Sequence, residues 1–282
     1  MTAGRFIALA LTVALATAGC GDTGHHAAEL VVGSRAGIES TLLADVYTGA
    51  LRSYGFPART EQASNPLAKL DSGTFVVVPS LTGRVLQAFQ PGATVRSDAQ
   101  VYKAMIGSLP EGIAAGDYTT AAEDKPALAV AESTSKSWGG SDLSALPQHC
   151  DGLVVGSVAG APTPSAVGSC RLPAAREFAD DAKLFAAVKA GEVTAAWTTT
   201  ADPNVPADLV VLTDGKPALV QAENVVPLYR RNELTDRQLL AVNEVAGVLD
   251  TAALVEMRRQ VTAGADPQAV ADAWLNEHPL GR

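Results

Sequence analysis

Residues 30–54 read LVVGSRAGIESTLLADVYTGALRSY, and this stretch decides the fold class. Its first three residues form an apolar run that stops at Gly33 and Ser34, which is typical of a buried strand followed by a loop. From residue 38 onward the apolar side chains return at helical spacing. A strand, a loop and a helix in this order predict the opening unit of an α/β domain.

The same alternation continues over most of the chain and then gives way to helices alone. Short apolar runs predict strands, and helical spacing with Ser, Thr or Asp at the start predicts helices. The expected strands are 30–32, 75–78, 127–131, 152–155, 193–198 and 209–212. The expected helices are 38–54, one beginning at 82, 97–108, one beginning near Ser141, 174–190, 235–249, 251–263 and 266–277. Such alternation predicts an α/β fold with mainly parallel sheets.

Length and composition limit the class of protein. The chain has 282 residues, of which 47% are hydrophobic and only 5% aromatic, and its formal net charge is −9. The length suits one large α/β domain or two lobes of about 100 to 150 residues each. An acidic chain is a poor partner for nucleic acid, which we therefore do not expect.

The N-terminus predicts export. The apolar run Phe6 to Ala16 would reach only about 16 Å as a helix, about half of a ~30 Å hydrocarbon core, so it fits the central region of a signal peptide. Small residues before Cys20 resemble the lipobox of bacterial lipoproteins, although Thr17 stands where that motif more often has Leu. The lipobox implies a diacylated Cys20 that anchors the chain to the outer face of the membrane. Plain signal cleavage and a structural Cys20 are the alternatives.

Cys150 and Cys170 remain as a pair in a compartment that permits disulfides. A bridge closing a loop of about 20 residues is worth roughly 3 kcal/mol in the chain-entropy model. It would restrain the Pro- and Gly-rich residues 160–165. A metal site or a redox pair would need further His and Cys partners or CxxC spacing, and no metal or cofactor is expected.

Several local strings, taken in their order, carry a resemblance. They are 31–34, 39–56, 73–83, 121–130, 187–202, 209–214, 224–228 and the C-terminal stretches 234–248 and 266–275. In this order the strings resemble the substrate-binding proteins of ABC importers for glycine betaine, choline and related osmoprotectants. The resemblance covers most of the chain after residue 28.

The resemblance implies a two-lobed periplasmic-binding-protein-like α/β fold with a helical C-terminus, whose lobes close around a solute. It implies lobe 1 at 29–121 plus 222–282 and lobe 2 at 122–221, after a signal peptide at 1–20 and a flexible tether at 21–28. It also implies a small-molecule solute, an ABC permease as partner, and a lipid-anchored place on the extracytoplasmic face of the cell membrane.

In this family, aromatic faces surround the methylated cation, and N–H groups at helix N-termini hold the anionic end of the ligand. Here Leu81 replaces the tyrosine of the cage, and Pro126 stands where an aromatic residue often lies. Thr82, in the same string as Leu81, is a candidate contact. Two walls of the aromatic cage are therefore missing.

Four further candidates carry charge or hydroxyl groups. Arg84 would clamp a carboxylate, which favours an anionic or zwitterionic solute over choline; the alternative is an exposed residue in a first helical turn. Asp124 would offer a negative charge to a cation, or cap the hinge. Ser40 would bond an anionic group of the solute and Glu39 would cap the helix, and helix capping is also the alternative for Ser40.

Trp197 is the best candidate for a cage wall, with Thr198 and Thr199 beside it, because the return strand of the family reaches the cleft there. A tryptophan that only covers the strand end is the alternative. Further aromatic faces would come from Tyr102, Tyr118 and Trp138.

Catalytic motifs are not evident: the chain has no Gly-x-Ser-x-Gly, no HExxH and no phosphate loop, so we expect a binding protein and not an enzyme. An envelope lipoprotein that keeps the fold but acts as an adaptor is the second hypothesis. A cleft filled by Leu81, Pro126 and their neighbours favours the adaptor. An open pocket lined by Trp197 and Arg84 favours the binder.

Overall fold

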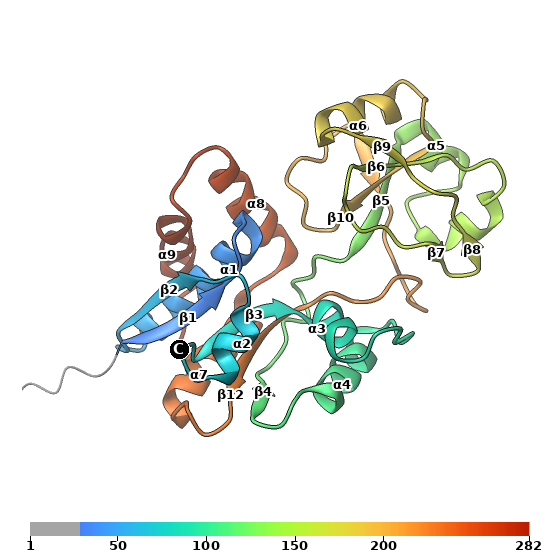
Figure 1. Cartoon of the computed structure of the whole chain (residues 1–282). Helices are drawn as coiled ribbons and strands as arrows, with labels where there is room; N and C mark the ends of the chain where they lie inside the picture. The colour runs from blue at the N-terminus through green and yellow to red at the C-terminus, as the bar shows by residue number, and fades with distance from the viewer. Residues whose placement is uncertain (1–28, 282) are drawn as a thin grey trace, which may run out of the picture.

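The computed structural model describes residues 29–281, which form two α/β lobes joined by two crossover segments (Figure 1). The expected signal peptide, the tether and Cys20 lie outside the described residues. The first sheet takes its strands from residues 30–115 and 225–230, and the second from residues 126–211. We keep the boundaries given above, at 121/122 and 221/222, as our proposal for where lobe 1 and lobe 2 meet.

Lobe 1 is built on a five-stranded sheet of order β2-β1-β3-β12-β4. Its strands are β1 (Leu30–Ser34), β2 (Ala58–Gln62), β3 (Val77–Leu81), β4 (Ile113–Ala115) and β12 (Val225–Arg230). Its helices are α1 (Ile38–Ser53), α2 (Pro66–Asp71), α3 (Thr82–Phe89), α4 (Asp98–Ser108), α7 (Asp236–Val248), α8 (Thr251–Thr262) and α9 (Pro267–Glu277). β1 is parallel to β2 and β3, whereas β12 is antiparallel to β3 and β4 because the chain returns through it from lobe 2.

Helix α1 is the central helix of lobe 1. All ten residues from Leu42 to Leu51 are buried, because the sheet covers one side of the helix and the C-terminal helices α7, α8 and α9 cover the other (Figure 1). A Cβ at Gly49 would lie 2.5 Å from Leu275 Cδ1, so glycine is required where α9 approaches α1. The C-terminal helices thereby complete the core of lobe 1.

Lobe 2 has a five-stranded sheet of order β11-β5-β10-β6-β9 and a short hairpin. The strands are β5 (Pro126–Ala131), β6 (Val155–Val158), β9 (Arg176–Phe178), β10 (Ala195–Thr199) and β11 (Leu209–Val211), and the hairpin is β7 (Ala166–Val167) with β8 (Cys170–Arg171). The helices are α5 (Glu132–Ser137), the 3-10 helix η1 (Leu143–His149) and α6 (Asp181–Lys189). β5 is antiparallel to β10 and β11, so this sheet is also mixed. The expectation of mainly parallel sheets is therefore wrong: each five-stranded sheet has two parallel and two antiparallel pairings, because the chain crosses between the lobes and returns.

The predicted disulfide is present between Cys150, directly after η1, and Cys170 in β8, with Cα atoms 5.7 Å apart. It closes the loop that contains residues 160–165.

Four predicted elements differ from the structure. The single helix expected at 174–190 is wrong: Asp180 caps a shorter helix, α6, and residues 176–178 pair with β6 as strand β9. Strand β3 begins at residue 77 and continues through Pro79, which faces Pro227 of β12, so neither residue presents an N–H at that point. Strand β6 begins three residues later than expected, and Asp142 caps η1 instead of Ser141.

No single helix within residues 29–281 is long and apolar enough to cross a membrane, and α7 and α8 meet the length and composition test only as a pair bent by 97°.

Candidate functional site

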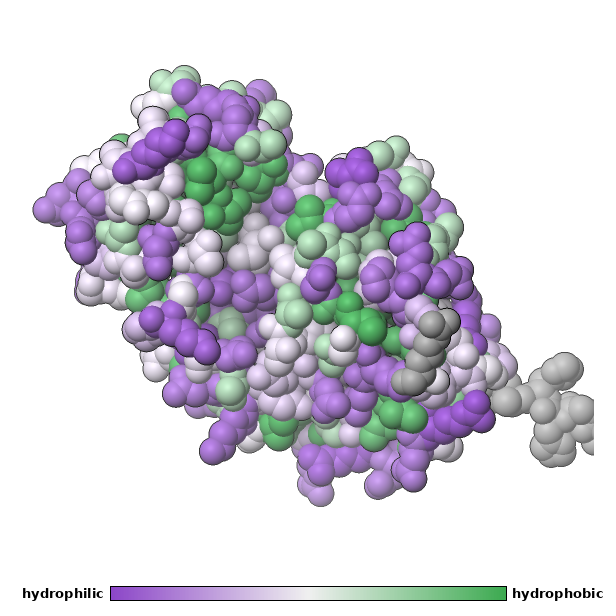
Figure 2. Space-filling view, turned by 180° about the vertical axis from the view of Figure 1, so that it is seen from behind, coloured by the Kyte–Doolittle hydropathy of each residue, from purple (hydrophilic) through white to green (hydrophobic). Residues whose placement is uncertain are grey.

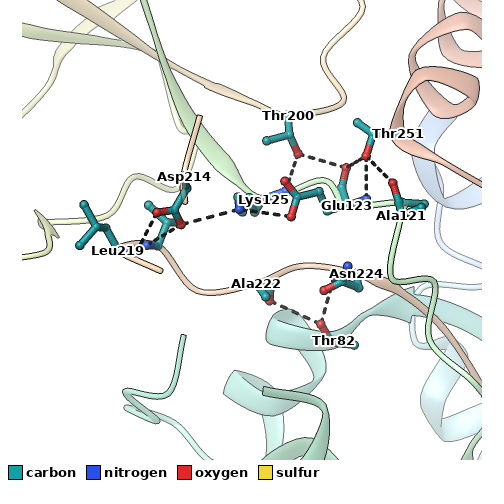
Figure 3. Close-up of polar contacts among 12 residues, drawn as sticks. Thr82, Ala121, Glu123, Lys125, Thr200, Asp214, Leu219, Ala222, Asn224 and Thr251 are labelled. Atoms are coloured by element: carbon teal, nitrogen blue, oxygen red, sulfur yellow. Dashed lines mark hydrogen bonds and ion pairs between the residues drawn. The ribbon is translucent and has the colours of Figure 1, made fainter. Parts of the chain in front are cut away.

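The two crossover segments, residues 116–125 and 212–224, lie side by side between the lobes and are fastened to each other (Figure 3). The Asp124 N–H donates to the Glu223 carbonyl at 2.9 Å. Thr200 Oγ1 donates to the Glu123 carbonyl at 3.0 Å and accepts from the Lys125 N–H at 3.1 Å. These bonds place the start of β5 and the end of β10 at one joint.

An ion pair between Lys125 and Asp214 also connects the two crossover segments (Figure 3). Lys125 Nζ lies 3.6 Å from Asp214 Oδ2 and 3.2 Å from Glu123 Oε2. The Asp214 carboxylate is buried and accepts the N–H groups of Leu219 and Val220 at 2.9 and 3.1 Å. Since the lysine lies on one crossover and Asp214 on the other, the pair links the two strands about which the lobes would bend.

A cavity of about 820 Å³ lies between the lobes, next to this joint. The space-filling view from behind shows a hollow between the two lobes (Figure 2). Its wall from lobe 1 and the crossovers is made by Arg84, Gln87, Asp124 and Glu223. Its wall from lobe 2 is made by Pro126, Val158, residues 161–165, Asp181, Trp197, Thr198, Thr199 and Asp202. A space of this size is typical of a small-molecule site.

Arg84, in the first turn of α3, extends its side chain to the mouth of the cavity and is about half exposed. Its Nη1 donates to Glu39 Oε1 at 2.7 Å, and its Nη2 lies 4.0 Å from Asp124 Oδ2. The Arg84 guanidinium is therefore neither free to bind a carboxylate of the solute nor fully solvated. Two carboxylates of the protein already neutralise much of its charge.

Asp124 is the most deeply buried charge of the cavity wall, with its side chain 2% exposed. Its Oδ2 lies 3.0 Å from Nη1 of Arg258 in α8, and that same nitrogen donates to the Ala201 carbonyl at 3.0 Å. Its Oδ1 is buried and has no hydrogen-bond partner among the described residues. One acceptor of this carboxylate is therefore buried without a donor in the part of the chain that the structure describes.

Glu223, directly before β12, lies beside Asp124 on the second crossover. Its Oε2 accepts the Arg84 backbone N–H at 2.9 Å, so it covers the N-terminus of α3. Burial raises the pKa of Glu223 to about 7, although the N–H bonds and the Arg84 charge act in the opposite direction. The helix N-terminus at which the family would hold an anionic group is thus occupied by a carboxylate of the chain itself.

Trp197 in β10 forms part of the wall from lobe 2 and is 7% exposed. Trp197 also packs in the hydrophobic core of lobe 2. The two predicted roles, a wall of the ligand cavity and a packing residue, therefore each describe part of its environment. Thr198 Oγ1 donates to Asp202 Oδ2 at 2.6 Å. Asp181 accepts from the Asn204 side chain at 2.9 Å, and burial, with the nearby charge of Asp202, raises the pKa of Asp181.

Three predicted site residues lie elsewhere. Leu81 is buried in the core of lobe 1. Thr82 is fully buried and fastens the return strand, because its Oγ1 accepts the Asn224 N–H at 3.1 Å (Figure 3). Ser40 Oγ accepts the Arg35 N–H at 2.9 Å and lines a separate lobe 1 pocket of about 460 Å³, which shares Arg84 with the cavity.

The capping alternative fails for both Glu39 and Ser40, because Gly37 occupies the N-cap of α1 and receives no side-chain bond.

The other aromatic candidates do not line the interlobe cavity. Tyr102 and Tyr118 pack against each other in lobe 1 with ring centroids 4.4 Å apart. Trp138 stacks on His149 at 5.0 Å. Of the described residues around the cavity, Trp197 alone is aromatic.

Sequence reasoning missed six polar residues of the cavity: Gln87, Thr163, Ser165, Asp181, Asp202 and Glu223. The one signal in the sequence was the position of three of these residues near the ends of strands or helices. Asp202 follows the end of β10, Glu223 precedes β12 at the crossover, and Asp181 opens α6. In α/β folds, loops at strand ends carry the binding residues.

Comparisons with known proteins agree on the class. Residues 28–277 match the family model described as the substrate-binding domain of the ABC-type glycine betaine transport system. Apo YehZ from Escherichia coli shares 19% identity at a TM-score of 0.70, covering 90% of this chain and 99% of that one. No curated protein matches the chain significantly in sequence.

Two further solved structures are similar. A glycine betaine/carnitine/choline ABC transporter protein shares 15% identity at a TM-score of 0.72, covering 88% and 98% of the two chains. A choline-binding protein in complex with choline shares 18% identity at a TM-score of 0.55, covering 89% of each. At these identities the structures show the two-lobe fold.

Proposed function

Because this chain belongs to the family of substrate-binding domains of ABC-type glycine betaine transport systems, we propose that it captures a small solute with a positively charged nitrogen between its lobes and delivers it to an ABC permease. The family is one of transporter binding proteins and not of enzymes. The observation that carries the proposal is the open interlobe cavity of about 820 Å³, lined by Trp197 and by four carboxylates.

The contents of the cleft favour the binder over the adaptor. An adaptor without a solute would be expected to have a cleft filled by Leu81, Pro126 and their neighbours. Instead Leu81 packs in the core of lobe 1, while Arg84 and Trp197 both line open space. The paired crossovers also supply the joint that closure over a solute requires.

Lipidation of Cys20 is the further part of the proposal, and it rests on the sequence before and after that residue. A diacylated N-terminus would hold the protein at the extracytoplasmic face, beside its permease. Mass spectrometry of the mature protein from its native host tests this part. A chain that begins at another residue, or that carries no acyl mass at Cys20, would contradict it.

Calorimetry tests the binding function. The purified protein is titrated with choline, glycine betaine, carnitine and proline betaine, and with amines and amino acids. We expect a dissociation constant of micromolar or below for at least one compound, as is usual for a specific site of about −8 kcal/mol. Small-angle scattering should then show closure of the lobes. If no compound binds and the scattering stays unchanged, the binding function is wrong.

Trp197→Ala should weaken the binding of that compound by about 1 to 3 kcal/mol, because the variant removes the one aromatic face of the cavity. Trp138→Ala is the matched control, since Trp138 stacks on His149 and does not line the cavity. Equal affinities for the two variants would remove Trp197 from the site.

A further inference from the structure

Acidic side chains outnumber basic ones around the interlobe cavity. Asp181, Asp202 and Glu223 form no ion pair with any side chain of residues 29–281, although all three line it. The one basic side chain of the wall, Arg84, is already paired with Glu39 at 2.7 Å. Arg258 pairs with Asp124, and the charge of Arg84 acts on Glu223, so the crossover side is partly compensated. Asp181 and Asp202 have no such partner among residues 29–281, and a cation that enters the cavity lowers the cost of holding these carboxylates close together.

The pKa values fit this arrangement. Burial is the largest cause of the raised pKa of Glu223 and of Asp181, and a neighbouring carboxylate acts in the same direction in both cases. The neighbour is Asp124 for the first and Asp202 for the second. The acidic groups thus lie as two pairs, one on the crossovers and one on lobe 2.

One hydrogen-bond acceptor of the cavity wall has no donor among residues 29–281. Asp124 Oδ1 is buried and has no partner among the described residues, whereas its other oxygen is bound to Arg258. A buried acceptor of this kind is stabilised only by an N–H or O–H group. A fully methylated ammonium has no N–H to donate, so it would leave Asp124 Oδ1 without a hydrogen-bond donor.

Aromatic surface, which a methylated cation needs, is scarce. Trp197 is the one aromatic residue that lines the cavity among residues 29–281, and only 7% of its surface is exposed. A single aromatic face stabilises a bound quaternary ammonium less than a cage of several faces does. The wall at Pro126 is apolar but carries no π-face.

A bare metal ion does not fit the same groups. Within the described part of the chain, no three or more His, Cys, Asp or Glu side chains are placed to hold one. A cavity of about 820 Å³ also suits an organic molecule better than a single ion.

We propose that the solute of this protein is an organic cation that carries N–H donors, a protonated amine or a guanidinium, and not a fully methylated ammonium. The inference rests on the proposed function and deepens it, because it names the ligand class of the same cavity. The carboxylates of the two walls bind the N–H groups, and Trp197 covers the carbon chain beside them.

Matched ligand pairs test this on the unmodified protein. Each pair consists of an amine and its trimethylated form: ethanolamine with choline, glycine with glycine betaine, and lysine with Nε-trimethyllysine. In any pair that binds, calorimetry should give a dissociation constant about tenfold or more lower for the N–H form. Equal or tighter binding of the trimethylated form would overturn the inference and leave the proposed function standing. Absence of binding by every member, and by arginine, would count against both.

Two variants then test which carboxylates bind the N–H groups of the solute. Glu223→Gln and Asp181→Asn should each weaken the N–H form by about fivefold or more, with a smaller effect on its trimethylated partner. Glu132→Gln is the control, because Glu132 lies exposed on α5 and pairs only with Lys136. Circular dichroism verifies that each variant is folded. If both site variants bind the N–H form as the control does, these carboxylates do not recognise it.

Discussion

Replacing Arg258 by methionine should strongly destabilise lobe 1. Arg258 lies in α8, is 6% exposed, and has Nη1 at 3.0 Å from both Asp124 Oδ2 and the Ala201 carbonyl. Methionine retains a long unbranched side chain but leaves the Asp124 carboxylate buried without its nearest positive charge. Breaking a buried pair in this way costs about 3 to 5 kcal/mol. For a chain of this size that corresponds to a fall in Tm of about 6 to 20 °C.

Urea unfolding followed by circular dichroism measures the effect. The double variant Arg258→Met, Asp124→Asn should recover much of the lost stability, because the neutral amide removes the uncompensated charge. Arg259→Met is the matched control on the same helix, since Arg259 is exposed and pairs only with Glu256. The reasoning is refuted if Arg258→Met lies within about 1 kcal/mol of the native protein, or if the double variant is no more stable than the single one.

Four other predictions follow from the same geometry. Because the pKa of Glu223 is raised to about 7, its ionised fraction rises from about a tenth at pH 6 to about nine-tenths at pH 8. Calorimetry should therefore show up to about tenfold tighter binding of a cation at pH 8, and Glu223→Gln should abolish the difference. Without solute, the raised pKa of Glu223 stabilises the folded state most at low pH, and this stabilisation is lost as the pH rises from about 4.5 to 7. Urea unfolding should show this loss in the native protein and not in Glu223→Gln. Gly83→Ala should cost about 1 to 3 kcal/mol in thermal unfolding, because its Cβ would lie 2.7 Å from the Ala222 carbonyl oxygen of the backbone, whereas Gly107→Ala, with open space around it, should not destabilise. Cys150→Ala with Cys170→Ala should lower stability by about 3 kcal/mol in urea.

Local patterns predicted those parts of the fold that depend on local sequence. The three C-terminal helices are found within one residue of their expected bounds, since each has a capping Thr or Asp and regular apolar spacing. Residues 174–190 misled the same reasoning. Their composition suits a helix throughout, but residues 176–178 pair with β6, a contact that no local pattern encodes.

The candidate site was harder to predict than the fold, because its residues come from distant parts of the chain. Arg84, Asp124 and Trp197 were found through the family strings and do line one cavity. Thr82 comes from an equally good string, yet its hydroxyl is occupied by the return strand 142 residues later. Glu223, next to Asn224 on the second crossover, was missed, because its role depends on the N-terminus of α3, which it reaches only in the folded chain.

The distribution of charge also connects recognition of the solute to closure of the lobes. Asp124 and Glu223 lie on the crossovers, while Asp181 and Asp202 lie on lobe 2. The carboxylates of the two walls repel each other when no cation lies between them, although Arg84 on one wall reduces this repulsion. A cation is attracted by both walls and gains most when they approach, which is the differential affinity that a ligand needs to shift the lobes toward closure. The carboxylate of a zwitterion would instead have to compete with Glu39 for Arg84, against a bond of 2.7 Å, so we expect a cation to drive this closure better than a zwitterion does.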